Sequence, residues 1–217
     1  MIRSIVTLGR LSAAVQSRRH TTTFLLSSLP ILFYAAIRSN DLASGAVALG
    51  IGSSWSAAAL AAYGLQSNRQ LDSRLCLAGL GSATIYLGRL ASFATISVIG
   101  AALLSTIVAL LEPELSWSTL MIGLMLAIIP ALSCGMLIGV LAPSELEATL
   151  VILAIFGIPF GLSLDSTAVK YTPGFGSRKY LADLGSSLEW GTHILHPLGI
   201  SILAICLATV VWRRRSC

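Results

Sequence analysis

Residues 117–141 read WSTLMIGLMLAIIPALSCGMLIGVL, and no charged side chain interrupts them. An α-helix rises about 1.5 Å per residue, so roughly 20 apolar residues span a hydrocarbon core of about 30 Å. Inside lipid, the backbone groups of such a segment must bond to one another, and a helix satisfies all of them. The stretch therefore predicts a membrane-spanning helix.

The composition of the whole chain agrees with this stretch. Hydrophobic residues make up 55% of the 217 residues and charged residues 11%, whereas a soluble domain has about 25% charged residues. The net charge of +5 comes from basic residues that flank the apolar blocks. They do not form the continuous basic stripe of a nucleic-acid-binding protein. We therefore expect a lipid-embedded chain that binds membrane lipid and no nucleic acid.

Five further apolar blocks accompany residues 117–141, and each is predicted to be a helix. They are residues 21–37, 42–65, 90–111, 148–164 and 190–212. The predicted fold is all-α, a single transmembrane domain over residues 1–217 with six transmembrane helices.

The charges between the blocks predict the orientation. With the N-terminus inside, the inner pieces are residues 1–20, 66–89, 142–147 and 213–217, and the outer pieces are residues 38–41, 112–116 and 165–189. The inner pieces hold ten Lys and Arg against three Asp and Glu, a net of +7, and the outer pieces hold four against six, a net of −2. Cytoplasmic loops carry the excess of Lys and Arg, which predicts a multi-pass protein of the cell inner or plasma membrane with both termini in the cytoplasm.

Residues 1–20 have the pattern of an amphipathic helix. Apolar side chains fall within one sector of the helical wheel: Ile5, Leu8, Leu11 and Val15. Arginines lie opposite, as in a helix that rests in the membrane interface. A cleaved signal peptide is a weaker interpretation, because its basic region would be about twenty residues long. An organelle-targeting segment is a third, since residues 1–40 contain five Arg and no acid.

Residues 66–89 are long for a connection between two spans. The segment is polar at first, then amphipathic, and is broken by Gly79 and Gly81 before the third span. A connection of a few residues would suffice, so the helical content indicates an element that contacts something.

Motifs of membrane enzymes are missing from the sequence. It contains no HExxH for a metalloprotease and no GxxxxGK[ST] for binding ATP phosphates. The predicted spans contain almost no charge, which disfavours a proton-coupled transporter or a pump. His193 and His196 share one helix face, either as polar residues at the membrane boundary or in a metal or proton role. We expect no enzyme activity, no metal and no cofactor in this chain by itself.

Residues 74–92 resemble the cytoplasmic loop of type-2 ABC exporter permeases. The matching elements are Ala78-Gly79, Ser82 and Tyr86-Leu87-Gly88-Arg89. The sequence departs from the family in lacking its frequent Glu-Arg-Glu run, which residues 68–72 replace. At the level of topology the resemblance covers nearly the whole chain, from an interfacial N-terminal helix through six spans to a long last outer loop.

The resemblance implies a cytoplasmic coupling helix that docks on a separate ABC ATPase subunit, which binds ATP and Mg. We expect Leu75 and Leu77 to be its apolar anchors, with Asp72 and Arg74 as charges at the rim. The connection at 143–147 then makes a second contact through its acidic residues, Glu145 and Glu147. The position of Ser144 before these acids independently predicts a helix N-terminus. Ordinary solvated loops are the alternative for both segments.

The resemblance also implies a second permease chain, the same or different, and alternating access driven by ATP. Substrate would pass between the two permeases along the second and fifth spans. The aromatic candidates for this path are Trp55, Tyr63, Phe156 and Phe160, and simple helix packing is the alternative. The outer loop at 165–189 would carry short helices that close the exit, or an aromatic anchor at the interface.

Two other functions share these features. A haem-exporter-type permease of cytochrome maturation has the same topology, and haem binding by the copurified complex would identify it. A non-transport membrane scaffold is favoured if no ATPase copurifies.

Overall fold

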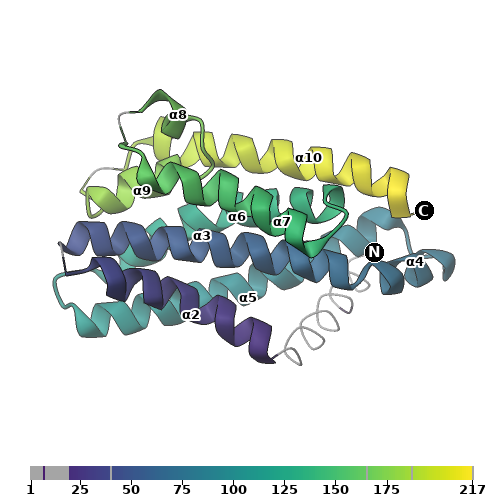
Figure 1. Ribbon diagram of the computed structural model, residues 1–217, viewed down its shortest axis with the longest axis horizontal. Helices are drawn as coiled ribbons and strands as arrows, with labels where there is room; N and C mark the ends of the chain where they lie inside the picture. The colour runs from purple at the N-terminus through teal and green to yellow at the C-terminus, as the bar shows by residue number, and fades with distance from the viewer. Residues whose placement is uncertain (1–6, 8–19, 40, 165, 187, 217) are drawn as a thin grey trace.

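A computed structural model describes the chain except residues 1–6, 8–19, 40, 165, 187 and 217, and it leaves out the side chains of 20–27, 160 and 214–216. Every element in the described part is helical (Figure 1). The elements are α2 (His20–Ile37), α3 (Leu42–Ser67), α4 (Arg69–Leu77), α5 (Ser82–Leu111), α6 (Trp117–Leu141), α7 (Glu145–Ile152), η1 (Leu153–Gly157), η2 (Ile158–Gly161), α8 (Thr167–Lys170), α9 (Phe175–Ala182), η3 (Trp190–Leu195) and α10 (His196–Ser216). The all-α prediction is confirmed. The predicted interfacial helix at 1–20 lies largely outside the described residues.

Four helices among the described residues are long and apolar enough to cross a membrane. They are α3, α5, α6 and the run Trp190–Arg213, which joins η3 to α10. This finding supports a membrane protein. The other two blocks predicted as spans are helical but are not among these four. In α2, the apolar part with described side chains is Ser28–Ile37, which is shorter than a span. The other is the fifth block, residues 148–164.

The fifth block is not one continuous α-helix. After α7 the chain widens into the π-helical turn η1 and then tightens into the 3₁₀ turn η2, and at Leu162 it becomes extended. Pro159 lies in η2 and has no N–H to donate to a preceding turn. The α-helical ladder of hydrogen bonds is therefore lost before the block reaches the length predicted from residues 148–164.

Helix α3 is the centre of the bundle, because its glycines let neighbours approach its backbone. A Cβ added to Gly52 would lie 2.7 Å from the Cα of Pro30 in α2, and one added to Gly50 would lie 2.6 Å from Leu181 in α9. Small residues permit such close contacts between membrane helices. Most of α3 is consequently buried inside the chain's own bundle.

The tightest contact in the bundle joins α3 to α6. Gly135 and Gly139, four residues apart on α6, lie against Ala58 and Ala62, four apart on α3. A Cβ on Gly135 would lie 2.7 Å from the Cα of Ala58, and a Cβ on Gly139 would lie 2.9 Å from the Cα of Ala62. The spacing matches the small-xxx-small pattern of closely packed membrane helices.

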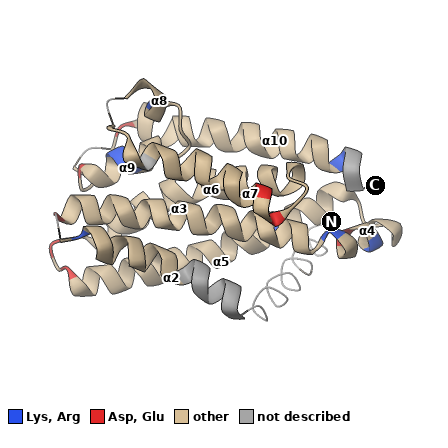
Figure 2. Cartoon of the chain, viewed as in Figure 1, with Lys and Arg blue, Asp and Glu red and all other residues tan. Residues whose placement is uncertain are grey.

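The charged residues gather at the two ends of the bundle (Figure 2). One end, called here the α4 end, holds α4, the connection from α6 to α7 and the C-terminal end of α10 (Figure 1). The far end holds the segment from 165 to 189, which contains α8 and α9. There Arg178 of α9 donates to the carbonyl oxygens of Pro159 and Leu162, at 2.6 and 3.1 Å.

Candidate partner-docking surface

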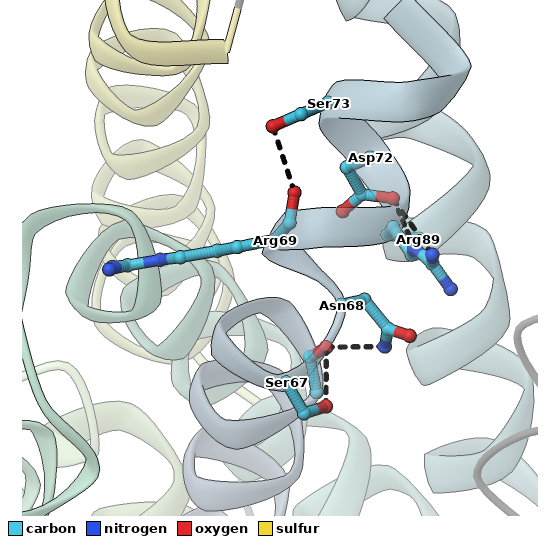
Figure 3. A network of polar contacts seen from close by, with 7 residues as sticks. Ser67, Asn68, Arg69, Asp72, Ser73 and Arg89 are labelled. Carbon is cyan, nitrogen blue, oxygen red and sulfur yellow. Dashed lines mark hydrogen bonds and ion pairs between the residues drawn. The ribbon is translucent and has the colours of Figure 1, made fainter.

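A buried ion pair fastens α4 to α5. The Asp72 carboxylate accepts hydrogen bonds from Nη2 of Arg89 at 2.8 Å and from its Nε at 3.3 Å (Figure 3). The two side chains are 1% and 4% exposed. Burial raises the pKa of the Asp72 carboxyl, and the Arg89 guanidinium opposes that rise. Removing either partner would leave the other charge buried without its counter-charge in this pair.

This pair corrects the expected place of Asp72. The sequence predicted an exposed charge at the rim of a docking site, and the structure buries the carboxylate. The reason is that α5 begins at Ser82, well before the predicted start at residue 90. Arg89 therefore lies in the early turns of α5, where it meets Asp72 of the preceding helix.

A single residue joins α3 to α4. Asn68 is buried, and its Nδ2 donates to the carbonyl oxygen of Gly64 at 2.6 Å (Figure 3). Past the junction, the Ser73 hydroxyl donates to the carbonyl oxygen of Arg69 at 3.0 Å. The Ser67 hydroxyl donates to the same carbonyl oxygen at 3.2 Å, so two side chains bond to the last turn of α3, where backbone donors run out. The short, bonded junction holds α4 at a defined angle to α3.

Arg69 connects α4 to the end of α6. Its side chain extends away from the Asp72–Arg89 pair (Figure 3), and Nη2 lies 3.0 Å from the carbonyl oxygen of Gly139 and 2.6 Å from that of Ala142. The last carbonyls of a helix lack intrahelical donors and carry partial negative charge, so a guanidinium suits them. Thus α4 is bonded to the ends of α3 and α6 as well as to α5.

The connection from α6 to α7 is ordered by its own side chains. Ser144 is the N-cap of α7: its hydroxyl accepts from the N–H of Glu147, and the Glu147 carboxylate accepts from the N–H of Ser144, both at 3.3 Å. This capping box confirms the helix start predicted from Ser144. Nε2 of Gln66 donates to the carbonyl oxygen of Ser144 at 3.1 Å, which ties the connection to α3.

Apolar side chains remain exposed at this end. Leu77 at the tip of α4 is 89% exposed and Leu146 of α7 is 70% exposed. We name the exposed side chains of α4 and of the first turn of α7 together the α4–α7 surface: Leu71, Arg74, Leu77, Glu145, Leu146 and Glu147. Leu75, predicted to be an anchor with Leu77, is half-buried and packs against the core of the chain instead.

Three of the four predicted pathway residues have described side chains, and each of these has neighbours within the chain. Trp55 is half-buried with its ring edge-on to Phe33, 5.8 Å between centroids, and the Tyr63 hydroxyl lies 2.6 Å from that of Thr149. Phe156 is buried beside a cavity of about 20 Å³. The side chain of Phe160 lies outside the described part. A role for these aromatic side chains in a substrate path stays a prediction.

His193 is buried, and its Nδ1 accepts a hydrogen bond from the N–H of Glu189 at 2.8 Å. Within the described part of the chain, no group of three or more His, Cys, Asp and Glu is placed to hold a metal ion. The ring of His196 instead lies edge-on to Phe175.

Sequence reasoning missed the residues that hold α4 in place, which are Asn68, Arg69 and Arg89. It also missed Gln66, which ties the connection from α6 to α7 to α3. One signal in the sequence could have indicated the ion pair: an acid, Asp72, and an arginine, Arg89, stand on either side of a turn that contains glycine. No protein-family model and no curated protein matches this sequence. The functional assignment therefore rests on the α4–α7 surface and its bonds to the membrane helices.

Proposed function

We propose that this chain is a membrane-spanning permease subunit of an ATP-driven exporter of the type-2 ABC class. A separate ATPase subunit docks on the α4–α7 surface, and a second permease chain completes the substrate path. The observation that carries the proposal is the two-sided character of α4. One side presents Leu77 to the surroundings, and the other is fixed to the membrane helices by Asp72 and Arg69.

The bonds of α4 suit a part that transmits movement. Arg89 ties it to α5, Arg69 to α6 and the Asn68 junction to α3. A displacement of α4 by a docked partner therefore shifts the ends of three spans together, because packed helices move as rigid units between discrete arrangements. The ATPase supplies ATP and Mg, and this chain supplies the moving helices.

The surface also suits a docking groove. Short helices bind in grooves by burying apolar side chains, while charges at the edge set orientation and association rate. Leu71 and Leu77 would be buried, with Arg74 on α4 and the acids of α7 at the edge. The acids and the arginine offer both signs of charge to a partner.

We expect Leu77→Asp to weaken ATPase association by about 2 kcal/mol or more, roughly 30-fold, because an anchor in an interface would be replaced by a buried charge. Arg74→Ala should cost less, about 1 kcal/mol, since an exposed ion pair is screened. The tagged chain is purified from membranes that contain the co-expressed ATPase, and bound ATPase and transport-linked ATP hydrolysis are measured.

Leu188→Asp is the matched control, an exposed leucine at the far end of the bundle. It should leave ATPase association unchanged. Full association and ATP hydrolysis in the Leu77→Asp complex would remove α4 as the docking element. Robust ATP hydrolysis by the purified chain alone would overturn the proposed division of labour.

The orientation is tested by cysteines at exposed positions in a variant without native cysteines. Because basic residues predominate at the α4 end, Arg74→Cys should react with an impermeant maleimide only in inside-out vesicles, and Tyr171→Cys only in intact cells. Both native side chains are exposed. Reversed labelling would place the α4–α7 surface outside the cell, where ATP does not reach it.

A further inference from the structure

A groove of about 240 Å³ lies midway along the bundle, remote from the α4–α7 surface. It runs between α2, α3 and α5, with Ile128 of α6 also in its wall. We call it the α2–α5 groove, and the residues used below are Ile31, Ser53, Leu60, Ser97, Gly100 and Leu103. An apolar cavity of about 150 Å³ admits a molecule the size of benzene. The groove therefore has room for a larger one.

The groove opens sideways from the bundle. Ile31 and Leu103 belong to its wall and are themselves exposed. None of the described residues that line it is charged, and it lies at the middle of two helices long enough to cross a membrane, α3 and α5. At that depth the surroundings are hydrocarbon. A molecule dissolved in the lipid can enter without passing through water.

The wall contains one hydroxyl that lacks a partner. Ser53 is 3% exposed, and its Oγ makes no hydrogen bond, whereas the neighbouring Ser54 donates to the carbonyl oxygen of Gly50 at 2.9 Å. A buried polar group without a partner is unfavourable. Ser97 of α5 adds a second hydroxyl to the groove. An acceptor oxygen on a bound molecule would satisfy the Ser53 hydroxyl.

The empty space is held open by rigid contacts. Apart from its own stretch of α5, no described residue has a heavy atom within 4 Å of a Cβ built on Gly100, so its side of the groove is unfilled. Nearby, Pro30 of α2 rests on the backbone of Gly52. That contact leaves α2 no room to move closer to α3.

We propose that the α2–α5 groove binds a small apolar molecule that carries a carbonyl-type oxygen and enters from the lipid. The oxygen accepts a hydrogen bond from Ser53, and the hydrocarbon body packs on Ile31, Leu60 and Leu103. A phospholipid chain lacks an acceptor at this depth, since its ester groups lie at the interface. The site does not depend on the proposed ATPase partner, because binding is a property of this chain alone.

Benzophenone is a suitable probe, since it is an apolar ketone that labels neighbouring C–H groups on irradiation. The purified chain in phosphatidylcholine vesicles is irradiated over a range of benzophenone concentrations, and labelled peptides are mapped by mass spectrometry. We expect saturable labelling of the part of α5 around Gly100. Gly100→Leu should fill the groove and reduce this labelling at least tenfold. Ser53→Ala should raise the half-saturating concentration about fivefold.

Gly199→Leu is the matched control, because a Cβ at Gly199 on α10 also meets no atom within 4 Å. It should leave the labelling of α5 unchanged, as should Leu77→Asp. Labelling that does not saturate, or that is equal in wild type, Gly100→Leu and Ser53→Ala, would overturn the site. Disulfide formation between Leu103→Cys side chains of two copies of the chain would also overturn it, because the groove would then be a contact between chains.

Discussion

Replacing Gly135 by alanine is expected to destabilise the protein by about 3 kcal/mol, because overpacking at a rigid contact forces the backbones apart. The added Cβ would meet the backbone of Ala58, which has no flexible side chain to move aside. Helix propensity alone predicts the opposite sign, since alanine is favoured over glycine by about 1 kcal/mol. Unfolding in mixed micelles with sodium dodecyl sulfate, followed by circular dichroism, measures the difference.

The same substitution at Gly100 provides the control. Apart from its own stretch of α5, no described residue lies within 4 Å of a Cβ there, so Gly100→Ala should leave the free energy of unfolding unchanged or raise it by up to about 1 kcal/mol. The two variants therefore differ in the sign of their effect. If Gly135→Ala and Gly100→Ala changed the free energy of unfolding equally, α6 would not pack closely on α3 at Ala58 and Ala62.

Replacing Asp72 by alanine should cost about 4 kcal/mol, because it leaves the Arg89 guanidinium buried without its carboxylate. Replacing Arg89 by methionine should cost a similar amount for the converse reason. Apolar groups of similar volume can replace a whole buried pair at little cost. The double variant, Asp72→Ala with Arg89→Met, should therefore be more stable than the sum of the single effects by about 2 kcal/mol or more.

The same detergent unfolding experiment completes this double-mutant cycle. Arg74→Ala is the control on α4, and because its side chain is exposed it should change the free energy of unfolding by less than about 0.5 kcal/mol. If the changes in the free energy of unfolding caused by the Asp72 and Arg89 substitutions simply add in the double variant, the two side chains do not interact. In the proposed exporter, Asp72→Ala should also lower transport while Leu77 remains available for docking.

The features predicted correctly from sequence depend on neighbouring residues alone. The bounds of α6 agree with the apolar run at 117–141, and α3 begins at the predicted Leu42. The Ser144 cap was also predicted, because its partner Glu147 is three residues away. Length, apolar content and capping are local quantities, and the backbone must satisfy them before any tertiary contact forms.

The errors came from contacts between distant residues. Asp72 was expected at the surface because an isolated acid on a short helix is usually solvated, and only the early start of α5 brings Arg89 to it. Leu75 and Leu77 have the same side-chain chemistry, so only the packing of α4 decides that the first turns inward and the second outward.

By itself, then, the sequence determined the membrane class, the all-α fold and the bounds of α2, α3 and α6 to within two residues, because hydropathy and helix signals act over short stretches of chain. The tertiary structure alone decided the central place of α3, the burial of the Asp72–Arg89 pair and the α2–α5 groove. Each of these requires two or more helices at a fixed distance, as at Gly135 on Ala58. That distance follows from packing between segments far apart in the chain, which no local pattern encodes.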